Sequence, residues 1–596
     1  MSTSAPEKVS VEVVPQPVDD EKHGYVVGSV LGVVEDEKYP VPTEEESQTL
    51  RKIAANPPMI IFALCLVELA ERASYYGAST VYSNFIEFPL PAGGSGTGAP
   101  PRGTQETAGA LGMGLQASDA LVLLFTFLAY LVPIFGGWWA DVHIGKYMAI
   151  IIGVLICGVA HIIQIIGAIP SVLEKGKSNS FPPFLIGLLL LAFGAGVFKP
   201  NVAPVILEQL PSQKPYTKTL KSGEKVIVDP ERTITRTMLL FYGFINIGAF
   251  YMLVTTIAEK YVGYWCAYLL AGCIYFILPI VLALIYKKTK RSPPSGSSEL
   301  GKALNIIGRA LRESKFQIWR KDFWDAAKPS VLARRGVTVD WSDQLVDDVR
   351  RTLVATEIFC YFPIWSVNDG GIGSVASNQG ASMTTNGAPN DLLSNLNALA
   401  IIIAIPILSH VIYPFLNRHN MMPGRITRIT FGFVLAAISG VCGAVVQYLV
   451  YKSSPCGYYA STCTVGVSPI SIWWQVPMYV LGAWSECFAN VTAYELAYSR
   501  APKSMRGLVM ALFLFNTALA SALGEVLVPV TEDPYLIWIW AGPAIALAVQ
   551  TVVFWFRFKS LNDDKYMTDD SSIQEREESD DVEMSASETV SVGAKN

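Results

Sequence analysis

The chain alternates long apolar runs with short polar segments, and the apolar runs exceed the length of ordinary elements of a soluble domain. A helix that crosses a bilayer needs about 20 mostly apolar residues, and twelve runs reach that length. They cover residues 57–86, 119–140, 147–169, 183–207, 236–257, 264–286, 350–371, 391–416, 427–451, 470–498, 507–529 and 535–558. We therefore expect an all-α polytopic membrane protein, because the chain has too few polar residues to cover such helices in water.

The spacing of the runs divides the chain into two similar halves. Six spans occupy residues 50–286, a polar linker covers 287–349, and six more spans occupy 350–558. This layout resembles the major facilitator fold, in which two six-helix bundles rock around a site near the membrane midplane. The linker begins with a Pro- and Ser-rich run and continues with apolar residues scattered among charges, so it forms either an amphipathic helix on the membrane surface or a loosely packed connection.

Charge is distributed very unevenly along the chain. The 596 residues carry a net charge of −5, and 16% are Asp, Glu, Lys or Arg. Residues 1–49 hold 11 acidic and 3 basic residues, and residues 559–596 hold 11 acidic and 4 basic residues, which leaves +10 for residues 50–558. Both acidic ends lack apolar periodicity and are predicted to be disordered tails.

Basic residues predict the orientation, since Lys and Arg accumulate in cytoplasmic loops. Thirteen of them lie in the linker alone, and placing the N-terminus in the cytoplasm puts most of the others on the same side. Only five then face outside: Arg102, Lys175, Lys177, Lys260 and Lys452. Both termini are therefore expected in the cytoplasm. No basic segment followed by a short apolar core and a cleavage site opens the chain, so no cleaved signal peptide is expected.

Charges deep in a span are functional candidates because they are expensive to insert. The first span places Glu68, Glu71 and Arg72 on one helix face, by their spacings of three and four residues. The fourth span carries Lys199, which can balance the remaining negative charge from across the bundle. A carboxyl group held between a lysine and a proton is a plausible coupling device, although a static ion-pair network that only joins helices is the alternative.

The second half has one deep charge, Glu486, in the tenth span. Its partner is a proton, a helix dipole or a cationic ligand; the alternative is a neutral, hydrogen-bonded side chain. With Lys199 on one wall and Glu486 on the other, the cavity matches a zwitterion with separated ends, such as a short peptide, and does not match a simple sugar or a lone inorganic ion.

Cysteine and histidine usage gives no sign of a metal site. Seven of the nine cysteines fall within spans, whereas Cys456 and Cys463 share an outside loop where an oxidising exterior permits a disulfide. The five histidines are isolated, and the chain shows no Ser/His/Asp, metal or cofactor motif. We expect no enzyme, no metal and no cofactor other than the proton as coupling ion.

Five motifs, in order along the chain, resemble those of the proton-coupled oligopeptide transporter (POT) family of the major facilitator superfamily, in its fungal form. They are Glu68-x-x-Glu71-Arg72 followed by Tyr75-Tyr76-Gly77; Gly136 to Lys146, with Gly137, Asp141 and Gly145; Gly194-Ala-Gly-Val-Phe-Lys199-Pro; Phe241-Tyr242 to Asn246 and Gly248; and Trp474-Gln475-Val-Pro477 through Glu486 to Pro502. The resemblance covers essentially residues 50–558.

The resemblance implies roles for individual residues. Glu68, Glu71, Arg72 and Lys199 would couple proton binding to binding of the peptide carboxylate, and Glu486 would bind the peptide amino terminus. The remaining substrate-binding candidates are Tyr75, Tyr76, Tyr130, Asn246, Trp365 and Asn397. Gly137, Asp141, Gly145 and Lys146 would form a cytoplasmic loop between the second and third spans.

The chain also departs from the family pattern. Ala73 replaces the motif's Phe, and Leu123 stands where animal members have a histidine. Ser79 stands where many members have an Arg paired with an acid, and Asp369 resembles that acid in position, so the outer gate must be held in another way.

These observations predict a proton-coupled symporter that imports di- and tripeptides across the plasma membrane, working as a monomer and without nucleic acid. The alternatives are a proton-coupled carrier of nitrate or a small metabolite, and a peptide-sensing receptor.

Overall fold

The computed structural model describes residues 40–562 except 211–213, 295, 297, 318–319, 321, 335, 371, 420, 422 and 501–504. The residues predicted as tails beyond these limits, 1–39 and 563–596, lie outside the described part. The described residues form two compact units: a small one from residues 40–53 together with 214–230, and a large helical one from the rest of the described chain.

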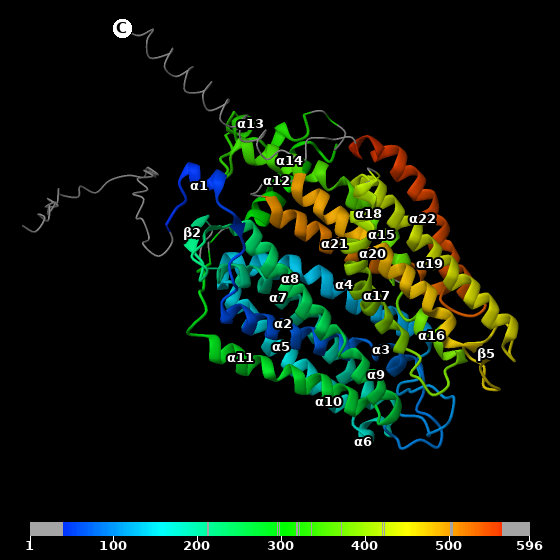
Figure 1. Ribbon diagram of the computed structural model, residues 1–596. Coiled ribbons are helices and arrows are strands. Elements are labelled where there is room, and N and C mark those ends of the chain that lie inside the picture. Colours follow the sequence, from blue (N-terminus) through cyan, green and yellow to red (C-terminus); the bar gives the residue numbers. More distant parts are fainter. Residues whose placement is uncertain are drawn as a thin grey trace, which may run out of the picture. The chain divides into compact units, whose positions relative to one another are not determined.

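In the large unit, the first half of the chain forms a bundle of helices coloured blue to green in Figure 1. Its helices are α2 (Met59–Ser79), α3 (Tyr82–Glu87), α4 (Leu115–Trp139), η1 (Ala140–Ile144), α5 (Lys146–Gly167), α6 (Pro170–Leu173), α7 (Lys177–Glu208), α8 (Pro230–Ala249), α9 (Met252–Tyr261), α10 (Tyr264–Tyr275) and α11 (Ile277–Ile285).

The second half forms a matching bundle, coloured yellow-green to red in Figure 1. Its helices are η3 (Glu357–Tyr361), α15 (Phe362–Asn368), α16 (Val375–Ala381), η4 (Leu392–Ser394), α17 (Asn395–Ile407), η5 (Leu408–Ile412), α18 (Tyr413–Arg418), α19 (Arg425–Ser453), η6 (Ile472–Gln475), α20 (Val476–Arg500), α21 (Arg506–Leu527), η8 (Val528–Val530), α22 (Leu536–Phe558) and η9 (Lys559–Asn562). Two short strands, β4 (Met383–Thr384) and β5 (Ser468–Ser471), pair in parallel beside it.

Within the described residues, eight helices are long and apolar enough to cross a membrane. The other four predicted spans fall on α2, on η3 with α15, on α17 to α18, and on α20. Helix α2 carries three charged residues, Glu68, Glu71 and Arg72, in its 21 residues. The fold is therefore the predicted one, but within the described residues some of the twelve predicted spans are interrupted helices.

The predicted span 350–371 is wrong as a single helix. Its first residues belong to α14 (Asp343–Ala355), and after η3 the helix α15 ends at Asn368. Pro363 lacks the amide that a continuing helix would use, and Gly370 and Gly373 have positive φ of 89° and 61°, which other residues adopt only with strain. The chain resumes as α16, so this element is broken where it faces the other bundle.

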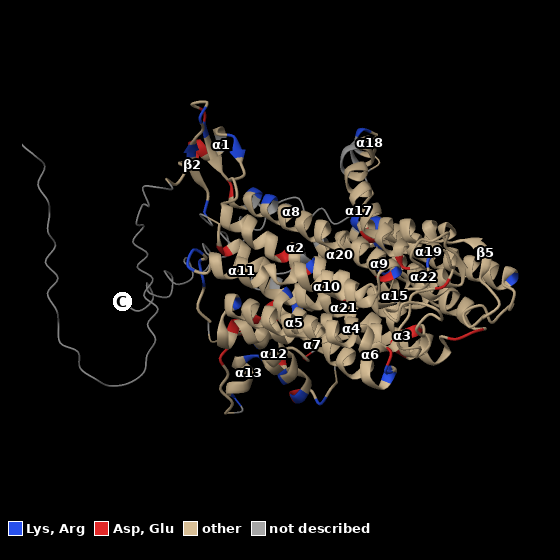
Figure 2. Ribbon diagram, turned by 90° about the horizontal axis from the view of Figure 1, so that it is seen from below, with Lys and Arg blue, Asp and Glu red and all other residues tan. Residues whose placement is uncertain are grey.

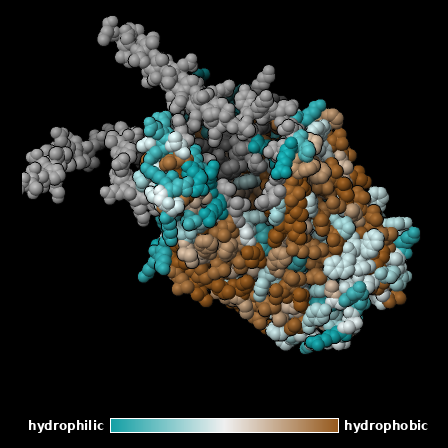
Figure 3. Space-filling view, in the orientation of Figure 1, coloured by the Kyte–Doolittle hydropathy of each residue, from teal (hydrophilic) through white to brown (hydrophobic). Residues whose placement is uncertain are grey.

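The outer surface of the large unit is apolar over a broad band, seen as brown in Figure 3. Large side chains such as Phe135, Ile280 and Val549 are more than half exposed, at 61%, 61% and 63%. Figure 2 shows that charged residues gather mainly at helix ends and in connecting segments. This distribution is the inverse of that of a soluble protein and fits a lipid-facing surface.

The linker forms helices that pack on the protein. Helix α12 (Glu299–Glu313) buries Ala303, Ile306 and Ala310, and these residues join a cluster with α14 and the start of α21. The short elements η2 (Asp325–Ala327) and α13 (Pro329–Ala333) connect them. The linker therefore contains a helix whose buried face packs on protein; whether it also lies on the membrane surface stays a prediction.

The small unit is a three-stranded sheet with one short helix. Helix α1 (Glu44–Thr49) lies within the segment 1–49 that we expected to be disordered, and strands β1 (Lys52–Ile53), β3 (Lys225–Val228) and β2 (Tyr216–Thr219) follow in that sheet order. Strand β1 pairs in parallel with β3, although about 170 residues separate them in sequence. With only two residues in β1, the strand is too short for its pairing to be recognised from the sequence pattern.

Ion pairs between exposed residues support the small unit. Arg51 donates to both oxygens of Glu224, at 3.0 and 2.9 Å, and Lys225 donates to Glu46. The bond from Lys225 lowers the pKa of Glu46 below its usual range, with a smaller contribution from the Thr43 amide.

Candidate functional site

Helix α2 carries a compact cluster of charges inside the first bundle. Arg72 Nε lies 3.0 Å from Glu68 Oε1, and the Arg72 guanidinium also pairs with Glu71 Oε2 at 2.5 Å. All three side chains are buried, at 6% exposure or less. The helical spacing that predicted one shared face is therefore realised, and the three groups together hold one net negative charge.

Lys199 supplies a cation to this cluster from helix α7. Its ammonium lies 3.9 Å from the centre of the Tyr75 ring and 4.8 Å from that of Tyr130, and it is close enough to attract Glu68 and Glu71. No described residue accepts a hydrogen bond from it. Aromatic faces stabilise a cation without using its hydrogens, so Lys199 keeps its donors available for a ligand.

Glu486 lies on α20 in the second bundle and is partly exposed. Its carboxyl group is within hydrogen-bonding reach of Asn397 on α17 and Asn490 one turn along α20. It is also close enough to interact electrostatically with Tyr76 and Tyr130 of the first bundle. The site thus has a cationic wall at Lys199 and an acidic wall at Glu486, and Tyr130 lies close to both charges.

Two predicted substrate-binding residues are engaged within the protein. The Asn246 amide donates to the Tyr242 carbonyl of its own helix at 2.8 Å. Trp365 is 4% exposed, and its indole donates to Ser485 Oγ at 2.8 Å. Ser485 in turn donates to the Gly432 carbonyl at 2.7 Å. Trp365 therefore fixes the part of α20 that carries Glu486.

Three residues that the sequence did not single out for binding also surround Glu486. Tyr242 is close enough to interact with it from α8, and Asn490 reaches it along α20. Asp369 is also near Glu486; its Oδ1 lies 2.8 Å from where a Cβ on Gly482 would stand. The sequence could have indicated part of this environment, because Gly482 and Asn490 are each four residues from Glu486 and therefore share its helix face.

The loop between α4 and α5 joins three helices. Gly145 has φ +81° and begins α5, and Lys146 pairs with Glu208 at the end of α7 at 3.0 Å. A Cβ on Gly137 would stand 3.5 Å from Pro200. Asp141 lies in η1 within the electrostatic reach of Lys146 and Glu208. The four loop residues therefore sit together around the ends of α4, α5 and α7.

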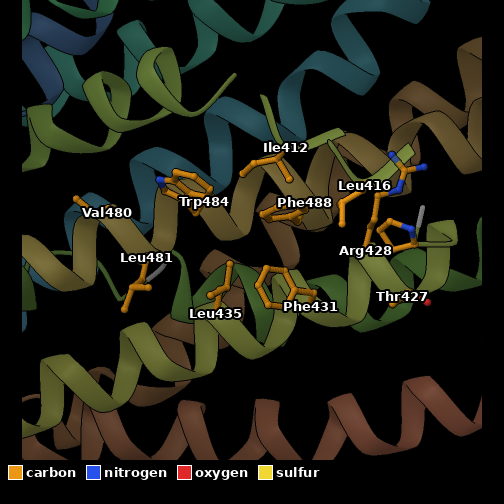
Figure 4. Close-up of a pocket in the computed structure, with 11 residues that line it drawn as sticks. Ile412, Leu416, Thr427, Arg428, Phe431, Leu435, Val480, Leu481, Trp484 and Phe488 are labelled. Atoms are coloured by element: carbon orange, nitrogen blue, oxygen red, sulfur yellow. The ribbon is translucent and has the colours of Figure 1, made fainter. Parts of the chain in front are cut away.

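A separate apolar pocket of about 520 Å³ lies between the η5–α18 region, α19 and α20. Figure 4 shows Trp484 and Phe488 of α20 pointing toward Phe431 and Leu435 of α19. Residues two apart on a helix point about 200° apart, so Glu486 faces away from this pocket. The pocket is therefore distinct from the charged site.

At one end, polar side chains join the two bundles directly. We call this the disulfide-end interface, because it lies beside β4 and β5 (Figure 1), the strands next to the loop in which Cys456 and Cys463 form a disulfide. The side-chain amides of Asn84 and Asn390 donate to each other, both at 2.8 Å, and Asn378 donates to Glu87. The Ser374 backbone amide donates to Asp119 at 2.7 Å, and the Ser374 hydroxyl contacts those of Ser83 and Ser118 at 3.0 and 2.8 Å.

No cluster of three or more His, Cys, Asp or Glu side chains suited to a metal ion occurs in the described part of the chain. The charged groups of the site are two carboxylates with one guanidinium on α2, one ammonium on α7 and one carboxyl group on α20. Such a set can bind protons and a ligand with two opposite charges.

Comparison with known proteins agrees with this arrangement. The family model described as "POT family" matches residues 147–551. A protein of Acremonium sp named MFS-type transporter ucsM is 52% identical over 94% of this chain and 91% of its own length. The peptide transporter PTR2 of Candida albicans is 38% identical over 90% of this chain and 87% of its own length.

Solved structures share the fold at lower sequence identity. The crystal structure of an auto inhibited POT family peptide transporter superimposes with a TM-score of 0.61 at 22% identity, covering 86% of this chain and 98% of that protein. The POT family transporter PepTSo gives 0.59 at 21% identity, covering 84% and 99%. The expected two-bundle membrane fold is thereby confirmed.

Proposed function

Because this chain belongs to the POT family, we propose that it is a proton-coupled symporter that imports di- and tripeptides across the plasma membrane. One observation supports this substrate class above others. Lys199 and Glu486 stand on opposite bundles, and Tyr130 lies close to both of them. A short peptide presents a carboxylate and an ammonium group at its two ends, and each end then meets the opposite charge.

The charges also give a route for coupling. Glu68, Glu71, Arg72 and Lys199 together sum to zero charge. A peptide carboxylate that binds Lys199 adds one negative charge and weakens the attraction of Lys199 for Glu68 and Glu71. A buried carboxylate that loses its cation is stabilised by a proton, so peptide binding favours uptake of one proton at this cluster.

The two ends of the helical bundles can be assigned to the two sides of the membrane, and this assignment gives the direction of import. Cys456 and Cys463 form a disulfide, which is typical of a loop that faces an oxidising exterior, and the basic linker is typical of the cytoplasmic side. We infer that both termini are cytoplasmic. Peptide and proton then enter from the side of the disulfide-end interface and leave at the linker side.

A carrier of another small molecule is the second candidate. The relative at 52% identity is named only as an MFS-type transporter, and Asp369 adds a second carboxyl group near Glu486. Two acids on this wall favour a ligand with a strongly basic end, and they disfavour nitrate, which gains nothing from either acid.

The test uses the purified protein in liposomes with an acidic exterior and a pH-sensitive dye inside. Di- and tripeptides are expected to acidify the interior, and nitrate is not. Glu71→Gln is expected to abolish uphill peptide accumulation, because the cluster can no longer exchange the proton. Glu174→Gln is the matched control, since this acid is exposed and far from the cluster in sequence. Acidification by nitrate and not by peptides would overturn the proposal, as would undiminished uphill uptake by Glu71→Gln.

A further inference from the structure

Two carboxyl groups from different bundles meet at the disulfide-end interface. Glu259 lies near the end of α9 in the first bundle, and Asp391 directly precedes η4 in the second. They are 1% and 2% exposed, and their carboxyl groups are within hydrogen-bonding reach of each other. An ionised carboxylate only accepts hydrogen bonds, so a bond between these two groups requires a proton on one of them.

The free oxygens of the pair are placed for that proton. Glu259 Oε1 accepts hydrogen bonds from the Asn84 amide at 2.9 Å and from the Tyr264 hydroxyl at 3.0 Å. In contrast, Glu259 Oε2 and both carboxyl oxygens of Asp391 are buried and receive no hydrogen bond from any residue that the structure describes. Buried oxygens without a donor are unfavourable, and a shared proton supplies the missing bond.

The surrounding charges do not remove the need for a proton. Lys260 attracts both carboxyl groups, but its ammonium donates to the Glu106 carbonyl. Two carboxylates and one ammonium leave one negative charge, which one proton neutralises. The other titratable groups that face the pair are the hydroxyls of Tyr264 and Tyr268 on α10 and Tyr479 on α20, and the more distant side chain of Glu106.

The other acids of this interface are bonded differently. Glu87 accepts from the Asn378 amide and Asp119 from the Ser374 backbone amide, each across the interface. Both therefore have a donor from the opposite bundle while ionised. Only Glu259 and Asp391, among the described acids of the interface, face one another.

We propose that Glu259 and Asp391 form a second proton-binding site, separate from Glu68 and Glu71, which holds the two bundles together at the disulfide end when it is occupied. When the proton leaves, two buried carboxylates repel one another. Because they belong to different bundles, separation of the bundles lets water reach both.

The test measures the separation of the bundles directly and needs no substrate, so its result is independent of the proposed function. Spin labels are attached at Arg102 in the first bundle and Asn386 in the second, both of which are exposed. Pulsed electron paramagnetic resonance in lipid nanodiscs measures the distance between the two labels from about pH 5 to about pH 8. The seven free cysteines are first replaced. Glu259→Gln and Asp391→Asn keep the shape and supply a permanent donor, and Glu174→Gln again serves as the exposed control.

In the wild type and in Glu174→Gln, the label distance is expected to lengthen as the pH rises. Both Glu259→Gln and Asp391→Asn are expected to lose this pH dependence and to stay at the short distance. A wild-type distance that does not change with pH would overturn the proposal. So would variants that titrate as the wild type does, or that stay at the long distance.

Discussion

Replacement of Lys199 by Gln, combined with amidation of the peptide, measures the free energy with which Lys199 binds the peptide carboxylate. A dipeptide with a free carboxylate and the same dipeptide with a C-terminal amide are each bound to the wild type and to Lys199→Gln. If Lys199 binds the carboxylate, amidation weakens binding to the wild type and has little effect on the variant. The four dissociation constants form a thermodynamic cycle, whose coupling free energy isolates this one contact.

The structure gives the expected size of the coupling. The Lys199 ammonium has no acceptor among the described residues, so the whole charge-assisted bond is available to the ligand. Such a bond contributes about 1.5–3 kcal/mol, which corresponds to about 10- to 150-fold in affinity. The contacts of Lys199 with the rings of Tyr75 and Tyr130, at 3.9 and 4.8 Å, are present with either peptide and cancel in the cycle.

The assay is competition of unlabelled peptide against a labelled reporter peptide at fixed pH, so that proton coupling contributes equally. Lys146→Gln is the matched control, because Lys146 pairs with Glu208 outside the site at 3.0 Å and should show the wild-type response to amidation. A coupling free energy below about 0.5 kcal/mol, which is the usual non-additivity of distant sites, would refute the assignment of Lys199 to the carboxylate.

Three further results are expected. Glu486→Gln should weaken binding of free dipeptides about 10- to 150-fold and leave N-acetylated dipeptides unaffected, in the same competition assay. Cys456→Ser should lower the thermal midpoint, because the bond to Cys463 closes a loop with a separation of seven residues and such a loop contributes about 2–3 kcal/mol. Amide-hydrogen exchange in the small unit should accelerate relative to its intrinsic rate as the pH falls through the pKa of Glu46, because the Lys225 contact that lowers this pKa stabilises the folded form only while Glu46 is ionised.

Each of these results has its own check. Equal loss for free and N-acetylated dipeptides would show that Glu486 does not bind the amino group. Cys442→Ser, which removes a free thiol, should leave the midpoint unchanged, and reductant should lower the wild-type midpoint to that of Cys456→Ser. Exchange at the Ile227 amide, bonded to the Arg51 carbonyl at 3.0 Å, is the probe for the small unit. A rate there that follows only the intrinsic pH dependence contradicts the role of Glu46.

The two-bundle fold and the charged core of the site could be predicted from local sequence patterns. Glu68 and Arg72 are four residues apart, so helix geometry alone brings them together, and a charge in an apolar run marks Lys199 and Glu486 as functional. The predictions that depended on one helix continuing through a run were weaker. The 350–371 span failed because Pro363 and Gly370 interrupt it, and apolarity does not report such breaks.

Contacts between segments far apart in sequence could not be predicted. Asn84 and Asn390 are 306 positions apart, and no periodicity connects an amide at the end of one run with an amide in a polar loop. The bond from the Trp365 indole to Ser485 could not be predicted either, because the contacts of a side chain within a bundle depend on packing that a single sequence does not contain. The role of Trp365 in substrate binding stays a prediction. The β1–β3 pairing was missed for the same reason.

The disulfide-end interface consists of short hydroxyls, amides and carboxyl groups in place of large apolar side chains, and this determines how easily it can open. When Asn84 parts from Asn390, each amide can bond to water instead, so each lost protein bond is replaced almost one for one. An apolar seal would instead lose about 25 cal/mol for every Å² newly exposed. Opening this end therefore costs less free energy than opening an apolar seal of the same area, so a smaller difference in ligand or proton affinity between the two forms is enough to shift the conformational population.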